Sequence, residues 1–214
     1  MHVTVIKVGG SLFDLPDLGA RLSDLLAQLN DSRPLLISGG GSAADLVRDW
    51  DRTHHLSETK AHWLAIQSLM LNDRLLSTIL PDASLVSSQS EAIAVWNEGG
   101  IPVLCSYDYL TQNSSSDFAD LPASWDVTSD SIAAWVSLTW PATELILLKS
   151  VDLAQEKTVP ELAEAGFVDA YLPTLADSLP CLRWCNLRAD SEPTQLATVT
   201  SGSSFQSKNA TGPA

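Results

Sequence analysis

Two runs of glycine, one of them beside a lysine, stand at the ends of predicted strands, and their chemistry suits a phosphate group. The first run is Lys7-Val-Gly9-Gly10-Ser11, and the second is Gly39-Gly40-Gly41 after the apolar residues 34–38. Backbone amides in a glycine turn, a hydroxyl and an ammonium together make a cradle for an anion. An ordinary strand-to-helix turn with a snorkelling lysine is the alternative interpretation of the first run.

A third motif adds a carboxylate at the start of a predicted helix. Asp126, Thr128 and Ser129 are good N-cap residues for the apolar helical pattern that follows them, and Asp130 falls in its first turn. The helix dipole favours a carboxylate there. Asp130 is also placed to pair with a lysine that arrives from a neighbouring strand end, although capping alone accounts for part of this pattern.

A second lysine ends the strongest strand pattern of the chain. Residues 144–148 read Glu-Leu-Ile-Leu-Leu, and Lys149-Ser150-Val-Asp152 follows directly. Strands that alternate with helices form parallel sheets, whose carboxyl ends share one edge and bind ligands there. The alternation therefore predicts that both glycine runs, Asp130 and Lys149 meet at one edge.

This set of residues fits in-line phosphoryl transfer. One glycine turn would hold the donor phosphates and the other the acceptor, while Lys7 neutralises the charge that grows on the transferred group. Asp130 would orient Lys7 and not act as a base, because the reaction depends on positioning. The sequence has no Gly-x4-Gly-Lys-Ser/Thr motif, so it is not that of a P-loop enzyme.

Periodicity predicts an α/β chain. The expected strands are 3–8, 34–38, 84–86, 101–105, 144–148, 181–188 and 196–200, and the expected helices are 18–30, 42–50, 60–79, 90–97, 130–136 and 158–165. Residues 106–124 are predicted to be a long polar loop over the substrate. His54, His55 and His62 are expected to be exposed or capping residues, because no metal-ligand spacing accompanies them, and no metal site is predicted.

Composition limits the classes of partner. The 214 residues carry a formal net charge of −14, which opposes binding to nucleic acid or to an anionic membrane surface. A small phosphate ligand stays compatible with this charge, because local contacts and Mg²⁺ act at short range. The three cysteines are expected to be free thiols, and with no secretion signal in the sequence a cytoplasmic protein is expected.

Residues 1–200 are expected to form a single domain, followed by a disordered tail at 201–214 that is rich in glycine and serine. The long apolar pattern at 60–79 has apolar residues on more than one face, which indicates burial on two sides and a possible dimer interface.

The four motifs resemble, in order, the signatures of the amino acid kinase family. They are Lys7-Val-Gly-Gly-Ser11, Ile37-Ser-Gly-Gly-Gly41, Thr128-Ser-Asp-Ser-Ile-Ala133 and Leu147-Leu-Lys-Ser-Val-Asp152, and the resemblance covers about residues 1–153. It implies a three-layer αβα sandwich around a mainly parallel sheet of about eight strands. It also implies ATP and Mg²⁺ as cofactors and a homodimer or a higher homo-oligomer.

The resemblance also implies roles for individual residues. Lys7 would stabilise the transition state, Asp130 would organise Lys7, and Gly9, Gly10 and Ser11 would contact the ATP phosphates. The residues that border the nucleotide would be Lys149, Ser150 and Asp152. The residues that face the acceptor would be Gly39, Gly40, Gly41, Trp125, Thr128 and Ser129.

Within the family, the short chain and the Trp125-x-x-Thr-Ser-Asp-Ser pattern resemble the branch whose acceptor is an aminomethylfuran phosphate of one-carbon cofactor biosynthesis. That acceptor is a phosphomonoester, and its product is a diphosphate. The chain departs from the family pattern at Leu153, where a glycine is usual, and lacks a second lysine that many members supply later. Lys149, Arg183 or Arg188 would take over that role.

Two other functions stay open at this point. The departures are compatible with a catalytically degenerate nucleotide-binding subunit of the same family. Separately, Gly39-x-Gly41-x-x-Ala44 fits the fingerprint of a Rossmann oxidoreductase, although a helical pattern around Trp63 replaces the strand with an acidic end that this fold requires.

Overall fold

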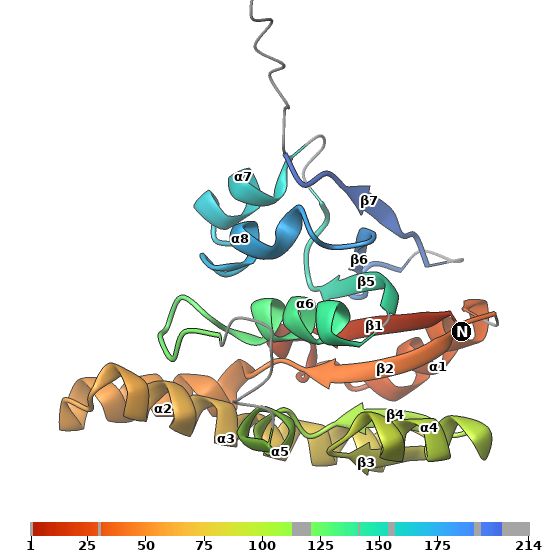
Figure 1. Ribbon diagram of the computed structural model, residues 1–214, viewed down its shortest axis with the longest axis horizontal. Helices are drawn as coiled ribbons and strands as arrows, with labels where there is room; N and C mark the ends of the chain where they lie inside the picture. Colours follow the sequence, from red (N-terminus) through yellow and green to blue (C-terminus); the bar gives the residue numbers. More distant parts are fainter. Residues whose placement is uncertain are drawn as a thin grey trace, which may run out of the picture.

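A seven-stranded, mainly parallel sheet organises the chain. The computed structural model describes residues 2–29, 31–112, 121–140, 142–153, 157–190 and 194–202. The strands, in the spatial order β3-β4-β2-β1-β5-β6-β7, are all parallel except the β6–β7 pair (Figure 1). They are β1 (Val3–Val8), β2 (Arg33–Ser38), β3 (Ala83–Val86), β4 (Ile101–Leu104), β5 (Ala142–Lys149), β6 (Leu182–Asn186) and β7 (Ala197–Val199).

Helices pack on both faces of this sheet, which confirms the predicted α/β sandwich. The helices are η1 (Gly10–Leu12), α1 (Leu18–Gln28), α2 (Gly41–His54), α3 (Glu58–Ile79), α4 (Gln89–Asn97), α5 (Ser106–Gln112), α6 (Ser129–Thr139), α7 (Val159–Glu164) and α8 (Leu172–Ala176). The described residues contain seven strands, against the eight or so that the resemblance implied.

The alternation of side chains in β1 divides the core in two. Val3 and Val5 lie in one apolar cluster with residues of α6, whereas Ile6 and Val8 lie in another with residues of α1. Successive side chains of a strand point to opposite faces, so this division places the odd-numbered residues of β1 on the α6 face. Lys7 is odd-numbered and therefore points toward α6.

The prediction of a loop at 106–124 was wrong over its first seven residues, which form α5. Tyr109 is buried; its ring packs edge-on against that of Trp140 at 5.7 Å and lies tilted against that of Trp135 at 5.8 Å. The Trp140 indole nitrogen also donates a hydrogen bond to the Tyr109 hydroxyl at 2.7 Å. This aromatic packing outweighs the polar composition that indicated a loop, while residues 113–120 lie outside the described residues.

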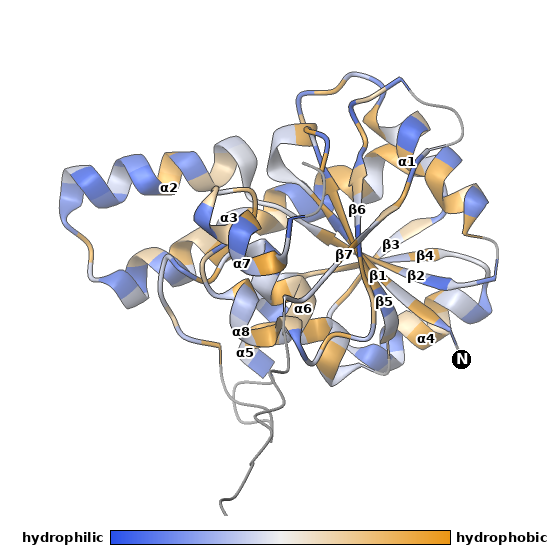
Figure 2. Cartoon of the chain, turned by 90° about the horizontal axis from the view of Figure 1, so that it is seen from above, coloured by the Kyte–Doolittle hydropathy of each residue, from blue (hydrophilic) through white to orange (hydrophobic). Residues whose placement is uncertain are grey.

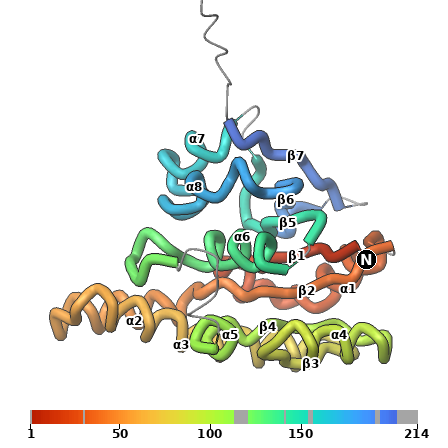
Figure 3. Tube along the Cα trace, in the orientation of Figure 1, coloured from red at the N-terminus to blue at the C-terminus, as the bar shows by residue number. Residues whose placement is uncertain are grey.

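Helices α2 and α3 form an antiparallel pair that extends beyond the sheet on one side (Figures 2 and 3). Helix α2 begins at Gly41, one residue before the expected start, so Ser42 is inside the first turn. The short helix α8 was not predicted, because five residues carry too little periodicity. The predicted disorder of the tail at 201–214 lies mostly outside the described residues.

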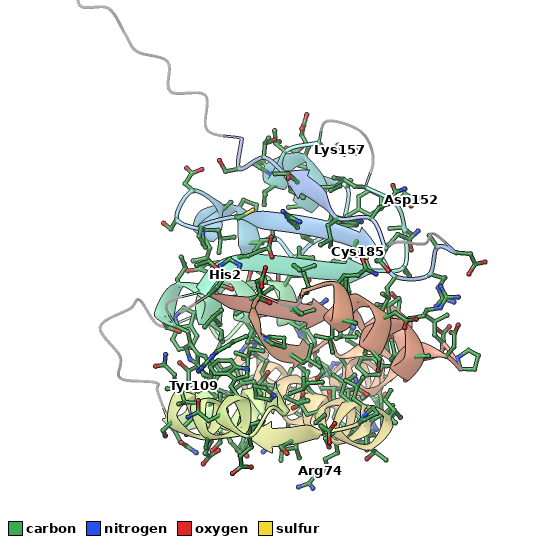
Figure 4. The ribbon with its side chains drawn as sticks, turned by 90° about the vertical axis from the view of Figure 1, so that its right-hand side faces the viewer. His2, Arg74, Tyr109, Asp152, Lys157 and Cys185 are labelled. Atoms are coloured by element: carbon green, nitrogen blue, oxygen red, sulfur yellow. The ribbon has the colours of Figure 1, made fainter. Side chains whose placement is uncertain are left out.

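All three cysteines are free, as expected from the sequence. Cys105 and Cys185 are buried, the latter on β6 within the body of the molecule (Figure 4), and burial raises the pKa of their thiols to about 12 and about 11. None of the described helices combines the length and the apolar character needed to cross a membrane.

Asp73 of α3 fastens this helix to the end of β2. Its side chain is fully buried and accepts a hydrogen bond from the Ser38 hydroxyl at 2.6 Å. Burial raises the pKa of Asp73 from its ordinary value of 3.8 to about 7, although the Ser38 bond opposes the shift. Since the folded pKa is above the unfolded one, the stability that Asp73 contributes is lost as the pH rises toward 7.

We therefore expect Asp73→Asn, which mimics the protonated acid, to be more stable than the wild type at neutral pH. The difference in free energy of unfolding should grow between about pH 4 and pH 7, by up to ~1.4 kcal/mol per pH unit. Urea unfolding at several pH values measures it, with the exposed Asp24→Asn on α1 as the control. A difference that does not change with pH would show that Asp73 is ionised throughout.

Candidate active site

The two glycine bends, at Gly9–Ser11 and at Gly39–Gly41, are in direct contact at the carboxyl edge of the sheet. A Cβ atom added to Gly10 would lie 2.1 Å from the Gly41 nitrogen, and one added to Gly39 would lie 2.5 Å from the Gly10 nitrogen. Gly41 has a φ of +51°, a conformation that side chains disfavour. The glycines are therefore needed for the two backbones to approach each other, and the predicted convergence of the bends is correct.

Lys7, Asp130 and Lys149 form a buried ionic cluster beside these bends. Asp130 is 4% exposed; its Oδ1 lies 2.9 Å from the Lys7 ammonium and its Oδ2 lies 2.7 Å from the Lys149 ammonium. Burial alone would raise the pKa of Asp130, but the charges of Lys149 and Lys7 outweigh burial and hold the pKa below its usual range. With two cations and one anion, the cluster carries one net positive charge.

Strand register explains why the two lysines meet. Lys7 of β1 is paired with Leu147 of the adjacent β5, and Lys149 follows two residues later on the same side of the strand. Both ammonium groups thus reach the α6 face, where the first turn of α6 presents Asp130. A pairing of Asp130 with a lysine was predicted from the strand ends, and the structure shows it for both lysines.

The ammonium of Lys149 has two more partners besides Asp130. It donates a hydrogen bond to the Phe167 carbonyl at 2.8 Å and lies 5.5 Å from the centre of the Trp184 ring. Burial lowers the pKa of Lys149, and the charge of Asp130 opposes this. Lys149 is therefore fixed within the cluster, and its contact with a nucleotide stays a prediction.

Asp169 caps the helix that presents Asp130, a role that the sequence analysis gave to nearby polar residues. Its carboxylate accepts hydrogen bonds from the backbone nitrogens of Thr128 and Ser131, both at 2.9 Å, and from the Thr128 hydroxyl at 2.9 Å. A further bond comes from the Ser131 hydroxyl. Because this cap is supplied 41 residues after Thr128, local sequence gives no signal for it.

A cavity of about 230 Å³ opens between the bends, α2, α3 and the segment before α6. Lys7, Gly10 and Gly41 line one end of it, and the predicted acceptor residues Trp125, Thr128 and Ser129 also line it. Residues that the sequence analysis did not assign to a site contribute the rest of the wall, among them Asp45, Arg48, His62, Ile66 and Leu69. Gly39 is not among the lining residues.

The Trp125 side chain is held between residues of α2. Its indole nitrogen donates a hydrogen bond to Asp51 at 3.1 Å, and the Arg48 guanidinium lies 5.1 Å from the ring centre. Arg48 also pairs with Asp45 at 2.7 Å at an exposed position. These contacts connect the segment before α6 with α2 across the cavity.

On the other side of the Lys7 bend, several polar groups meet at the ends of β5 and β6. The Ser11 hydroxyl donates to the Ser150 hydroxyl at 2.9 Å, and Asn186 donates to the Asp152 carboxylate at 3.0 Å. Arg188 donates to the Ser11 carbonyl at 2.7 Å. Ser150 and Asp152, two of the residues predicted to border a nucleotide, therefore lie here, whereas Lys149 lies in the ionic cluster.

Of the three candidates for the missing lysine, Arg183 lies elsewhere. Its guanidinium pairs with Glu144 at 2.8 Å, where β5 begins, while Lys149 and Arg188 lie beside the bends.

Among the described residues, no three His, Cys, Asp or Glu side chains are grouped so as to hold a metal ion. Helix α2 is followed directly by α3, so the strand with an acidic end that the Rossmann fingerprint requires does not follow it.

We expect Asp130→Asn to destabilise the protein strongly, because two buried ammonium groups would then face each other without an anion. Removing one member of a buried ionic cluster costs on the order of 3–5 kcal/mol in free energy of unfolding. The double variant Asp130→Asn/Lys149→Met should recover part of this loss. Urea unfolding measures both, with the exposed Asp126→Asn as the control, and an unchanged midpoint for Asp130→Asn would contradict the stabilising role of the cluster.

The chain is similar to known proteins in sequence and in fold. The chain is 27% identical over 161 residues to the [5-(aminomethyl)furan-3-yl]methyl phosphate kinase of Methanocaldococcus jannaschii, a match that covers 73% of this chain and 69% of that one. The structure is similar to uridylate kinase from Archaeoglobus fulgidus, with a TM-score of 0.57, 17% identity and coverage of 85% and 88% of the two chains.

A second solved structure with the same fold is the UMP kinase of Bacillus anthracis, with a TM-score of 0.61 and 12% identity over 92% of this chain and 98% of that one. At these identities the structural matches show the fold alone. The sequence model of the amino acid kinase family matches residues 2–153, which contain both glycine bends and the whole ionic cluster. The chain therefore belongs to the amino acid kinase family.

Proposed function

We propose that this protein is an ATP-dependent kinase that phosphorylates a phosphomonoester, an aminomethylfuran phosphate, to give a diphosphate. The family membership makes the chain a phosphotransferase. The observation that carries the proposal is the cluster of Lys7, Asp130 and Lys149 beside two glycine bends that touch each other. The acceptor is suggested by the similarity to the [5-(aminomethyl)furan-3-yl]methyl phosphate kinase of Methanocaldococcus jannaschii.

The residues of the chain divide the work of phosphoryl transfer between them. The first amides of η1, at Gly10 and Ser11, have no partner within that short helix and are suited to hold donor phosphates. Lys7 faces the cavity from between the bends and would stabilise the charge on the transferred group. Asp130 holds the Lys7 ammonium in place and needs no proton of its own to do so.

The bound nucleotide would supply the phosphoryl group, and Mg²⁺ would offset part of its charge. Mg²⁺ commonly binds substrate phosphates and one or two carboxylates. Asp152, which accepts a hydrogen bond from Asn186, is one carboxylate on this side, and Asp14, which pairs with Arg188, is another. We assign the second cation of the nucleotide side to Arg188. Its guanidinium pairs with Asp14 at an exposed position, whereas the Lys149 ammonium is held in a buried pair with Asp130 and Arg183 lies elsewhere.

The cavity supports the assignment of a small phosphorylated acceptor. Its volume of about 230 Å³ suits a small molecule, its glycine end offers amides for a phosphate, and Ile66, Leu69 and Trp125 offer apolar surface for a ring.

A catalytically degenerate nucleotide-binding subunit is the second candidate, motivated by Leu153 and by the absence of the later lysine.

We expect the purified protein to release ADP from ATP and Mg²⁺ when [5-(aminomethyl)furan-3-yl]methyl phosphate is supplied. Lys7→Met should lower kcat by about 10²–10³-fold, because a charge that stabilises the transition state is lost. A coupled assay for ADP and mass spectrometry of the diphosphate measure both. Binding of ATP without turnover across a panel of phosphomonoesters would favour the degenerate subunit.

Variants of Arg188 and Arg183 test, in the same assay, which arginine contributes to the binding of ATP. Arg188→Met should raise the KM for ATP about tenfold or more, since a hydrogen-bonded cation beside the phosphates is removed. Arg183→Met removes the same charge at a site beyond the bends and should leave this KM unchanged. Equal effects of the two variants would remove the assignment of Arg188.

A homo-oligomer is proposed from the exposed apolar residues of α3 and its neighbours. Leu71 and Leu75 of α3 are 68% and 39% exposed, and Leu85 of the edge strand β3, which packs against α3, is 37% exposed. A second copy would cover this surface. Sedimentation velocity should find an oligomer that Leu71→Glu dissociates, and a monomeric wild type would contradict the proposal.

A further inference from the structure

His62 is a buried residue of the cavity wall, contrary to the expectation that it is exposed or capping. The side chain is 5% exposed and projects from the first turns of α3. Its Nδ1 lies 2.8 Å from the Ser124 carbonyl oxygen, which can only accept a hydrogen bond. Nδ1 therefore carries a proton, and in the neutral ring Nε2 holds a lone pair.

The surroundings of His62 favour this neutral form. Burial lowers the pKa of the ring, opposed by the Ser124 bond and by the charge of Glu58. Within the described part of the chain, Nε2 makes no hydrogen bond. The ring thus offers a hydrogen-bond acceptor to the cavity that it lines.

Helix α3 sets the distance between this acceptor and the glycine bends. Asn72 donates hydrogen bonds to the carbonyls of Gly39 and Gly40 at 2.7 and 2.8 Å, and Leu69 lies beside Gly40. His62 precedes Leu69 by seven residues, or about 10 Å along the helix axis. The cavity therefore has a phosphate end at the bends and a distal end at His62.

The two ends have complementary chemistry. Lys7 and the bend amides make the first end attractive to an anion, and Ile66 and the Trp125 ring line the wall with apolar surface. At the distal end, the His62 lone pair requires a donor. Asp45 also lines the cavity, but its carboxylate is 69% exposed and paired with Arg48 at the rim.

We propose that His62 selects an acceptor with a protonated primary amine, whose ammonium donates a hydrogen bond to Nε2 while its phosphate lies at the glycine bends. This inference rests on the proposed function, because it names the part of the acceptor that the cavity recognises. A phosphomonoester of similar length without the amine leaves Nε2 unpaired in a nearly buried place, which costs affinity.

The test measures binding without ATP, by calorimetry, for two probes. The first is [5-(aminomethyl)furan-3-yl]methyl phosphate and the second is furan-3-ylmethyl phosphate, which lacks the amine. A hydrogen bond to a charged group is worth roughly a tenfold or greater difference in Kd. We expect the wild type to prefer the first probe by this factor.

His62→Asn is the informative variant, because its amide can still donate to the Ser124 carbonyl while Nε2 is removed. It should lose the preference, because the affinity for the first probe falls and the second probe no longer leaves Nε2 without a partner. His62→Phe, which keeps the ring volume, should do the same and serves as the second variant. His54→Asn, the same substitution at an exposed residue of α2, should retain the wild-type preference.

The outcomes separate this inference from the kinase proposal. A preference that His62→Asn abolishes supports the inference even where no ADP is formed, in which case the proposed activity alone is wrong. The inference is overturned if the wild type binds both probes equally or neither, or if the preference survives His62→Asn. Loss of the preference in Asp45→Asn but not in His62→Asn would also overturn it, by placing the ammonium at the rim.

Discussion

One buried carboxylate contacts two buried ammonium groups, and these contacts constrain how β1, β5 and α6 are arranged. Asp130 has one oxygen for Lys7 and the other for Lys149, and all three side chains are nearly excluded from water. Buried charges are costly unless they are paired, so the register of β1 on β5 and the position of α6 must both be kept. A shift of either strand by one residue would turn its lysine to the opposite face.

The same cluster explains how an acidic chain can handle phosphate. The net charge of −14 repels anions at long range, but the cluster places one net positive charge at the meeting point of two amide-rich bends. At contact distance such a local charge outweighs a screened and diffuse one, because the Debye length is about 8 Å at physiological salt. This difference in range is the physical basis for the expectation that the chain binds a small phosphate ligand and not a polyanion.

The ends of β1 and β5 could be predicted from the sequence, because an apolar run followed by a lysine is a local pattern. The apolar run before Lys7 and the run before Lys149 fix where β1 and β5 end, and parallel strands bring those ends to one edge. Asp169 was not predicted as a cap, because it reaches α6 from a distant segment of the chain. The burial of His62 was not predicted either, because a helical pattern with several apolar faces does not indicate which element covers each face. Helix α5 was missed since its stability comes from the packing of Tyr109 against two tryptophans.

The glycines of the two bends allow a ligand to approach the backbone and also allow the two bends to contact each other. Glycine in such a turn is usually explained by the approach of a ligand, yet at Gly10 and Gly39 the space for a Cβ atom is already filled by the other bend. The contact between the bends brings the backbones of Gly10 and Gly41 together, and Asn72 holds the second bend by its carbonyls. Helix α3 carries Asn72 and, two to three turns earlier, His62, so one rigid element fixes the distance between the phosphate end and the distal end of the cavity. In the proposed binding mode, the helix that holds the second bend in place therefore also sets the length of acceptor that fits the cavity.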